Sequence, residues 1–245
     1  MTSSHLSSQS DVHAQLPRTT DVKPQPYRLG LGMKWLYRAY LSRQFAVTSH
    51  HVHRFPTTGP VILAPNHLGI LDGPLLGAFS PRMVHAVGKV EAFAGLQGVL
   101  LRRFGQIPVD RWIVDSLAVR QSIRTLRDGR VLSVYPEGAR GAGDFAQIRT
   151  GVAYLAMVTG APIVPVALLG TRAPGQDVES RPPRGSRVDV VYGEPITVEP
   201  VSFPRRQFDV RAVADEIGAV LRIHVQMAVV ATGNPLPGLP GDKGT

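Results

Sequence analysis

The sequence predicts an α/β protein with a single domain, whose central sheet is flanked by helices and preceded by an amphipathic helix. Short apolar runs typical of buried strands alternate along the chain with longer segments of helical spacing. The 245 residues fit one large domain or two small ones, and 43% hydrophobic residues are enough for a substantial core. Because strands and helices alternate along the chain, we expect one domain with a central sheet.

The charge and the residue types limit the classes of function. The absence of cysteine excludes disulfides, thiolate chemistry and cysteine-ligated zinc. A net charge of +9 indicates an anionic partner, which is nucleic acid, an anionic membrane surface or a phosphorylated substrate. Nucleic acid fits least, because no helix-turn-helix, zinc-finger or RNA-recognition signature is present and only 7% of residues are aromatic. No signal-peptide pattern is visible, so the expected location is cytoplasmic.

The first part of the chain divides into a tail and a basic helix. Residues 1–26 are rich in Ser, Thr, Gln, His and Pro without periodicity, which predicts a disordered tail. Residues 27–46 have apolar residues at helical spacing with basic residues between them: Met33, Leu36, Tyr37, Tyr40 and Leu41, with Lys34, Arg38 and Arg43. A basic amphipathic helix with Trp and Tyr is typical of one that docks on a membrane. The alternative is a helix that packs on its own domain with a solvated basic edge, and both can hold.

Residues 47–230 carry the alternating elements of the domain, and residues 231–245, rich in Gly and Pro, are expected to form a flexible tail. The expected strands are 47–54, 61–64, 83–87, 107–109, 131–135, 163–169 and 188–192, and the expected helices are 91–101, 116–127, 149–158 and 209–230.

Two patterns suggest functions that the surrounding sequence does not support. The uncharged segment Thr150–Thr171 is long enough to span a membrane, but a glycine and two prolines interrupt it. We therefore expect a helix followed by a strand and no transmembrane span. His51 and His53 would share one face of the first strand, but two histidines without a third ligand do not define a metal site, and none is expected.

The stretch Asn66–Asp72 follows the expected strand 61–64 and carries a histidine and an aspartate. On a continuous helix five residues rotate by roughly 140°, so His67 and Asp72 would not share a face. They can meet only across a tight turn, for which Gly69 gives the backbone freedom. Asp72 would then hold one ring nitrogen of His67 and leave the other free as a general base. In the alternative interpretation, Asp72 is a helix N-cap and His67 is a polar residue of a loop.

Charged side chains also follow other apolar runs. A tight turn in Val134–Gly141 presents Glu137 and Arg140, and Arg111 follows a short extended segment. In an open α/β sheet, ligands bind beyond the carboxyl ends of the strands, so these side chains are expected to converge with the histidine and aspartate. Each has a plain alternative: a glutamate in an ordinary turn, arginines at the surface and a lysine, Lys89, that simply follows a strand.

Four blocks stand in one order along the chain. They are Asn-His followed by four residues and Asp (Asn66–Asp72), a segment that ends in Arg (Phe104–Arg111), Pro-Glu-Gly-x-Arg (Pro136–Arg140), and an apolar run with proline (Ala161–Val166). In these blocks the sequence resembles the glycerolipid acyltransferases typified by lysophosphatidic acid acyltransferase (1-acylglycerol-3-phosphate acyltransferase). The resemblance covers residues 56–192, and the first and third blocks together are quite specific.

The resemblance implies a central mixed sheet and acyl transfer from acyl-CoA, or from acyl carrier protein, to a hydroxyl of a glycerolipid. His67 would deprotonate that hydroxyl, and Asp72 would orient the imidazole. Direct attack on the thioester needs no acyl-enzyme, which suits the absence of cysteine and of a Gly-x-Ser-x-Gly sequence, and no cofactor or metal is implied. Glu137 would contact a glycerol hydroxyl of the acceptor or hold an arginine. The residues that would bind the acceptor and its phosphate are Lys89, Arg111, Glu137, Gly138 and Arg140.

The chain departs from the family pattern at Gly69, Ala139 and Ile148-Arg149, where many members carry Ser, Thr or Ser, and Phe-Lys. The acceptor is therefore open: lysophosphatidic acid is the first choice, and another lysophospholipid or a glycolipid is the alternative. The basic helix would dock the protein on the cytoplasmic face of the membrane that holds this acceptor. Two other classes of function are hydrolysis, with water in place of the acceptor, and non-catalytic binding of lipid or nucleic acid.

Overall fold

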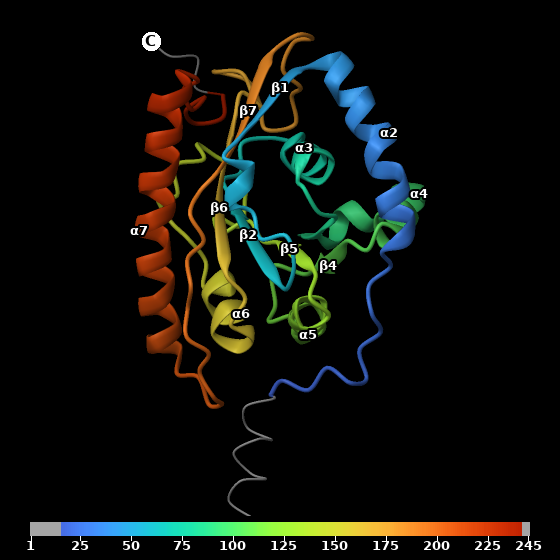
Figure 1. The fold of residues 1–245 in the computed structure, drawn as a ribbon, viewed down its shortest axis with the longest axis vertical. Coiled ribbons are helices and arrows are strands. Elements are labelled where there is room, and N and C mark those ends of the chain that lie inside the picture. The colour runs from blue at the N-terminus through green and yellow to red at the C-terminus, as the bar shows by residue number, and fades with distance from the viewer. Residues whose placement is uncertain (1–15, 242–245) are drawn as a thin grey trace, which may run out of the picture.

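The computed structural model describes residues 16–241 and confirms the predicted α/β domain with a central mixed sheet (Figure 1). Within these residues, seven strands form one sheet in the order β1-β7-β6-β2-β5-β3-β4. Their bounds are β1 Ala46–His50, β2 Val61–Pro65, β3 Val84–Lys89, β4 Ile107–Val109, β5 Val131–Ser133, β6 Ile163–Leu169 and β7 Arg187–Tyr192.

The directions of the strands bring the predicted site residues to one edge of the sheet. Neighbours in the series β6, β2, β5, β3 and β4 are parallel, whereas β7 is antiparallel to β6 and β1 is parallel to β7. Leu63 of β2 and Ala86 of β3 both pair with Ser133 of β5, so the carboxyl ends of these strands lie side by side. This is the edge at which an open α/β sheet binds its ligands.

Helices cover both faces of the sheet, with α5, α6 and α7 on one face and α2 and α3 on the other (Figure 1). In β2, Ile62 packs with the first group of helices, and its neighbour Leu63 packs on the opposite face. Because both faces are covered, β2 and β6 are buried along their whole length. The helix bounds are α2 Arg28–Gln44, α3 Asp72–Phe79, α4 Gly95–Arg103, α5 Ser116–Arg127, α6 Gly151–Thr159 and α7 Gln207–Thr232.

The helix predicted over 116–127 forms with those bounds as α5. Its N-cap is Asp115, whose side chain accepts a hydrogen bond from the backbone N–H of Ala118 at 2.9 Å. Ile123 and Leu126 are fully buried, whereas Leu117 at the start of the helix is exposed. The apolar spacing therefore predicted the helix correctly, although Leu117 in its first turn is not part of the core.

The uncharged segment Thr150–Thr171 forms α6 and β6, as predicted. Gly160 follows α6 with φ 66°, a left-handed conformation that ends the helix. No helix within residues 16–241 is long and apolar enough to cross a membrane.

The strand predicted over 47–54 is too long. β1 ends at His50 because His51 is left-handed, with φ 55°, and Val52–Arg54 form a 3-10 helix, η1. The side chains of His51 and His53 therefore do not share a strand face. Within the described part of the chain, no group of three or more His, Cys, Asp or Glu residues is placed to hold a metal ion.

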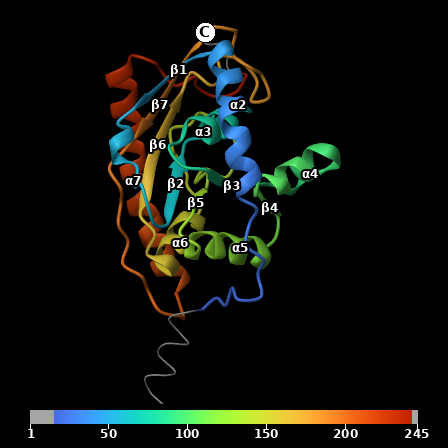
Figure 2. The same cartoon turned by 45° about the vertical axis from the view of Figure 1, so that its right-hand side comes forward.

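The helix predicted over 91–101 is divided. A 3-10 helix, η2, covers Val90–Phe93, Ala94 is extended, and α4 begins at Gly95, which has φ 56°. The chain then folds back so closely that a β-carbon at Gly98 would lie 1.8 Å from the carbonyl oxygen of Phe93. The division therefore depends on glycine at two places, and α4 projects away from the sheet (Figure 2).

The segment before α2 is not a free tail over its described part. Two arginines of α5 donate hydrogen bonds to its carbonyls, Arg124 to Val22 at 3.1 Å and Arg120 to Arg18 at 3.0 Å. Val22 is buried. The prediction of a disordered tail over 1–26 is corrected for 16–26, because these contacts come from a helix about a hundred residues away. Residues 1–15 lie outside the described residues.

The segment after α7 is also held to the domain. The side chain of Asn234 donates a hydrogen bond to the buried carboxylate of Asp189 at 3.0 Å, and Arg172 donates to the carbonyl of Gly238 at 2.6 Å. The prediction of a flexible tail over 231–245 is therefore corrected for 231–241, whose partners lie on β7 and after β6. Residues 242–245 lie outside the described residues.

The helix predicted over 27–46 is present as α2, and it packs on the domain while leaving apolar residues exposed. Leu41 is 1% exposed, and Lys34 donates hydrogen bonds to the backbone carbonyls of Ser80 and Pro81 after α3. Lys34 is therefore bound to the domain and is not part of a solvated basic edge. Trp35 and Leu36 are 69% and 65% exposed.

Candidate active site

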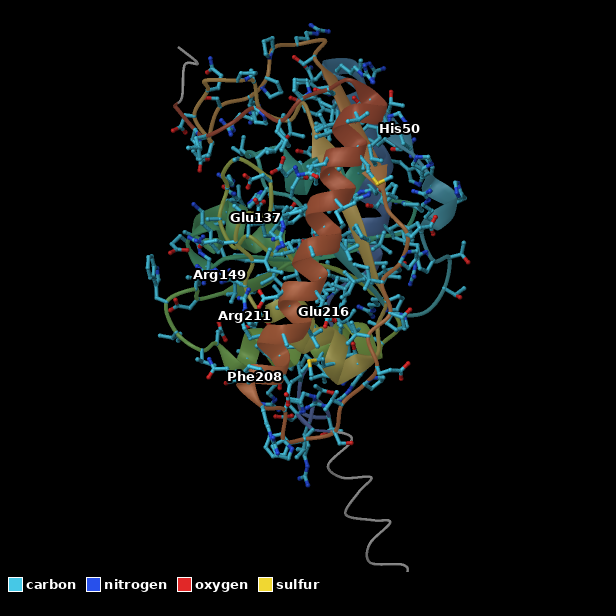
Figure 3. All side chains as sticks on the ribbon, turned by 90° about the vertical axis from the view of Figure 1, so that its left-hand side faces the viewer. His50, Glu137, Arg149, Phe208, Arg211 and Glu216 are labelled. Carbon is cyan, nitrogen blue, oxygen red and sulfur yellow. The ribbon has the colours of Figure 1, made fainter. Side chains whose placement is uncertain are left out.

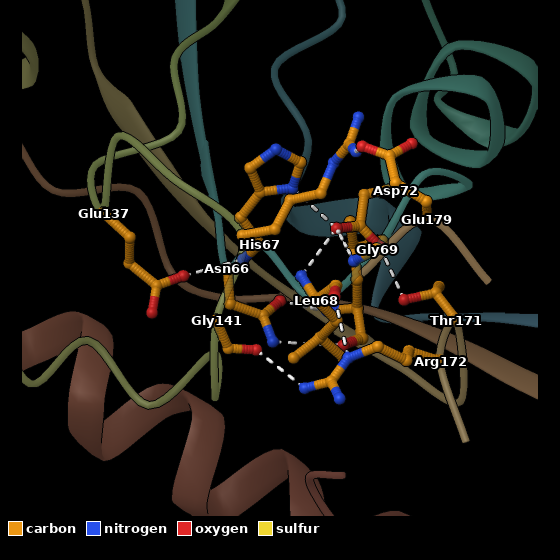
Figure 4. Close-up of polar contacts among 12 residues, drawn as sticks. Asn66, His67, Leu68, Gly69, Asp72, Glu137, Gly141, Thr171, Arg172 and Glu179 are labelled. Atoms are coloured by element: carbon orange, nitrogen blue, oxygen red, sulfur yellow. Dashed lines mark hydrogen bonds and ion pairs between the residues drawn. The ribbon is translucent and has the colours of Figure 1, made fainter. Parts of the chain in front are cut away.

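The candidate site begins at the end of β2, where the side chain of Asn66 continues the hydrogen bonding between β2 and β6. The amide of Asn66 donates to the carbonyl of Leu168 at 3.1 Å and accepts from the N–H of the same residue at 2.7 Å. These two bonds attach the start of the loop to β6 and direct the next residue, His67, outward over the sheet edge (Figure 4).

His67 and Asp72 are in direct contact. His67 Nδ1 lies 2.7 Å from Asp72 Oδ2, which also accepts from the backbone N–H groups of Leu68 at 2.6 Å and Gly69 at 2.9 Å. The other oxygen, Oδ1, accepts from the hydroxyl of Thr171 at 2.5 Å. A buried carboxylate with these donors is an acceptor, so in the neutral imidazole the proton lies on Nδ1 and Nε2 carries the lone pair.

The turn between His67 and Asp72 differs from the predicted one in two details. The N-cap position of α3 is Leu71, and Asp72 is the first helical residue, so its carboxylate closes the turn before the helix. Gly69 does not have a positive φ, and a β-carbon there would make only ordinary contacts, 3.4 Å and longer. The turn therefore depends on the bonds to Asp72 and does not require glycine at position 69.

The turn after β5 directs Glu137 behind the histidine. Gly138, with φ 71°, closes a turn onto the carbonyl of Tyr135, and a β-carbon there would lie 2.2 Å from the side chain of Arg149. Glu137 Oε2 accepts from the backbone N–H of His67 at 2.7 Å, and Oε1 accepts from that of Phe145 at 3.3 Å.

Glu137 therefore supports the His67 loop, whereas the sequence predicted that it would contact the acceptor or hold an arginine. It is also not among the residues that line the cavity described below. Burial raises the pKa of Glu137 to about 7, although the N–H groups of His67 and Phe145 act in the opposite direction.

Arg172 is a buried residue of the site that the sequence did not reveal. Its guanidinium donates to four backbone carbonyls, those of Leu68 at 2.9 Å, Gly141 at 2.9 Å, Gln176 at 2.8 Å and Gly238 at 2.6 Å. It thereby joins the His67 loop, the Glu137 turn, the loop after β6 and the segment after α7. The only signal for Arg172 in the sequence is its position: it follows Thr171 just after β6, the strand that pairs with β2.

The histidine and the three cations predicted for the site line one cavity. His67, Lys89 at the end of β3, Arg111 after β4, and Arg140 all line it, as does Gly138. Arg111 donates to the carbonyl of Gly138 at 3.1 Å, and Arg140 forms an ion pair with the exposed Glu179. The predicted convergence at the sheet edge is confirmed for these residues, whereas Asp72 and Glu137 lie behind the histidine.

The cavity is large and mainly apolar, with a volume of about 1060 Å³. At the polar end of the cavity, the ring of Tyr135 stacks on that of His67, with 4.0 Å between the ring centroids. Such a space accepts a long apolar group with one polar end beside the histidine. Apolar side chains from both faces of the sheet line it, among them Leu76, Met83, Phe93, Leu101, Val119 and Leu155.

Comparison with known proteins identifies the family of this chain. Residues 46–169, about half of the chain, match the Acyltransferase family, and the chain belongs to this family. It is 25% identical over 161 residues to the 1-acyl-sn-glycerol-3-phosphate acyltransferase of Bacillus subtilis, covering 65% of this chain and 78% of that protein. It is 30% identical over 145 residues to the lyso-ornithine lipid O-acyltransferase of Pseudomonas aeruginosa, covering 58% of this chain and 55% of that protein.

A solved structure shares the fold. The 1-acyl-sn-glycerophosphate (LPA) acyltransferase PlsC from Thermotoga maritima is similar with a TM-score of 0.59 and 19% identity, over 91% of this chain and 88% of that one.

Proposed function

We propose that this acyltransferase moves a fatty acyl group from acyl-CoA, or from acyl carrier protein, to a hydroxyl of lysophosphatidic acid or a related lysophospholipid. One observation carries the proposal: the ring of His67, held by Asp72 at 2.7 Å, lines an apolar cavity of about 1060 Å³. The names of the relatives in Bacillus and Thermotoga support the choice of acceptor. The acyl donor is a co-substrate, and the proposed reaction uses no other cofactor.

In the proposed mechanism, Nε2 of His67 takes the proton of the acceptor hydroxyl as its oxygen attacks the thioester carbonyl. Asp72 holds the imidazole in the required tautomer and stabilises its protonated form. General-base catalysis contributes roughly 10² to 10⁴ in rate. Positioning the two substrates contributes more, up to about 7–11 kcal/mol, and the apolar cavity and the cations would supply that positioning.

We infer that Lys89, Arg111 and Arg140 bind the anionic group of the acceptor. All three line the cavity that holds His67. Arg140 is already paired with Glu179, which is exposed, so an acceptor phosphate would take the place of that carboxylate. Arginine suits this exchange because its planar group binds phosphate through two hydrogen bonds.

A lysolipid without a phosphate is the second candidate acceptor. The relative in Pseudomonas aeruginosa is named a lyso-ornithine lipid O-acyltransferase, and it is 30% identical to this chain. The ion pair between Arg140 and Glu179 would present one positive and one negative charge to an acceptor that itself carries one of each sign. The acceptor must therefore be tested with both types of lysolipid.

We infer that exposed apolar side chains near the mouth of the cavity hold the protein peripherally on a membrane. Trp35 and Leu36 of α2, Leu96 of α4, and Ile113 and Val114 before α5 are all strongly exposed. Other residues of the same elements line the cavity. These exposed side chains would enter the bilayer interface. The positive charge of the chain suits an anionic membrane surface, which we propose to be the cytoplasmic face of the cell membrane.

The experiment is an acceptor panel with oleoyl-CoA as the donor, read by CoA release and by mass spectrometry of the lipid product. Lysophosphatidic acid, other lysophospholipids, lyso-ornithine lipid and a glycolipid form the panel. We expect CoA release that depends on an acceptor, and His67→Ala should lower it by at least about 10²-fold. His53→Ala, at an exposed histidine of η1, is the matched control and should retain the activity.

Other results would point to other classes of function. Wild-type turnover in His67→Ala would contradict the proposed base. CoA release without any acceptor would favour hydrolysis. Salt-sensitive binding to anionic vesicles without CoA release for any acceptor would favour a non-catalytic lipid-binding domain.

A further inference from the structure

The hydroxyl of Tyr135 is a buried polar group that the fold does not use. Its oxygen is shielded from solvent and has no hydrogen-bond partner among the described residues. A buried hydroxyl without a partner costs free energy, since it has lost its bonds to water. Phenylalanine would fill the same position without this cost, so the hydroxyl itself requires an explanation.

The hydroxyl lies beside the proposed base at the wall of the cavity. The rings of Tyr135 and His67 are stacked, with centroids 4.0 Å apart and an angle of 29° between the planes. Both residues line the cavity. A β-carbon placed on Gly73, the residue after Asp72, would lie 3.7 Å from the hydroxyl oxygen. The ring of Tyr135 therefore forms part of the wall beside His67, and its buried hydroxyl would meet a reacting carbonyl once the substrate displaces the atoms that cover it.

The charges around Tyr135 keep its proton in place. Burial and the negative charge of Asp72 raise the pKa of Tyr135 well above its usual value, and the positive charge of Arg140 acts in the opposite direction. A phenol that stays neutral is a hydrogen-bond donor and does not compete with His67 as a base.

We propose that Tyr135 is a catalytic residue whose hydroxyl donates a hydrogen bond to the thioester carbonyl oxygen as that oxygen becomes an oxyanion. This proposal rests on the proposed function. The acceptor oxygen bonds to the carbonyl carbon, its proton moves to Nε2 of His67, and the carbonyl π electrons move to the oxygen that Tyr135 binds. The C=O bond then re-forms, the C–S bond breaks, and the sulfur leaves as a thiol with the proton from His67.

A fixed donor in a site shielded from water is suited to this step. It is aimed before the reaction starts, so no solvent has to reorganise as the charge develops. The stacked ring holds the oxygen of Tyr135 in place, and the hydroxyl has no other hydrogen bond to break before it donates to the oxyanion.

The test is Tyr135→Phe, measured with oleoyl-CoA and the best acceptor of the panel. We expect kcat to fall about 100-fold, as for other single oxyanion donors. The KM for oleoyl-CoA should stay within about twofold, because the bond forms fully only in the transition state. The Tm should stay the same or rise, because the substitution removes an unpartnered buried hydroxyl.

Tyr192→Phe is the matched control. Tyr192 is buried in β7, outside the cavity, and its hydroxyl donates to the hydroxyl of Ser80 at 3.3 Å. We expect this variant to keep the wild-type kcat and to have a lower Tm, which is the reverse of the result for Tyr135→Phe.

An active wild type with an equally active Tyr135→Phe variant would overturn this proposal alone. A raised KM at unchanged kcat would also overturn it, because the hydroxyl would then bind the substrate in its ground state. A wild-type protein that transfers no acyl group to any acceptor would overturn the proposed function, and this proposal with it.

Discussion

Replacing Glu137 with glutamine tests whether a single carboxyl behind the histidine makes the stability of this protein depend on pH. The carboxyl binds the backbone N–H groups of His67 and Phe145 at 2.7 and 3.3 Å, and burial raises its pKa to about 7. Glutamine has nearly the same size and cannot titrate. The substitution therefore removes the titration while it changes the packing little.

The sign follows from the pKa values of the two states. In the unfolded chain the pKa of Glu137 is the ordinary 4.5, and in the folded protein it is about 7. The folded protein binds the proton more tightly, so stability from this group is complete below about pH 4.5 and is lost as the pH rises through about 7. At about 1.4 kcal/mol for each pKa unit, the difference corresponds to about 3 kcal/mol.

Urea unfolding of the wild type and of Glu137→Gln at several values between about pH 4 and pH 8 measures the free energy of unfolding of each at each pH. We expect Glu137→Gln to gain about 3 kcal/mol relative to the wild type across this range. Glu216→Gln, at an exposed glutamate of α7 (Figure 3), is the control and should follow the wild type at every pH. A difference between wild type and Glu137→Gln that is the same at both ends of the range would refute the reasoning.

Two further predictions concern the bonds that hold the His67 loop in place. Thr171→Val removes the hydroxyl that donates to the buried carboxylate of Asp72 and should cost about 2 kcal/mol in urea unfolding, whereas Thr171→Ser should retain most of that stability. Arg172→Met leaves four backbone carbonyls without their donor and should cost about 4 kcal/mol, whereas Arg103→Met, at the exposed end of α4, should change stability little. Equal unfolding midpoints within either pair would contradict the prediction for that pair.

The contact between His67 and Asp72 could be predicted because it is local. The two residues are five positions apart at the end of an apolar strand, so the chain has few ways to separate them. The convergence of Arg111 and Arg140 could be predicted from topology, because parallel strands end at the same edge of a sheet. Periodicity predicted α5 with its bounds and the helix and strand between Thr150 and Thr171.

The partners of Glu137 and Arg172 could not be predicted in the same way. Each binds backbone groups of loops that are distant in sequence, and any residue type supplies the same N–H or carbonyl group. The same reason explains why residues 16–26 were predicted as a free tail, since arginines of α5 bind the carbonyls of that segment.

The sequence by itself determined the order of the elements, the apolar strands that are buried on both faces, and the histidine and aspartate at the end of β2. These features depend on residues that are close together in the chain. Only the tertiary structure decided that Glu137 lies behind His67, that Arg172 joins four segments, and that the hydroxyl of Tyr135 is buried without a partner. Those features depend on where distant loops meet. The free energies of burial and hydrogen bonding decide where they meet, and no local sequence pattern contains these energies.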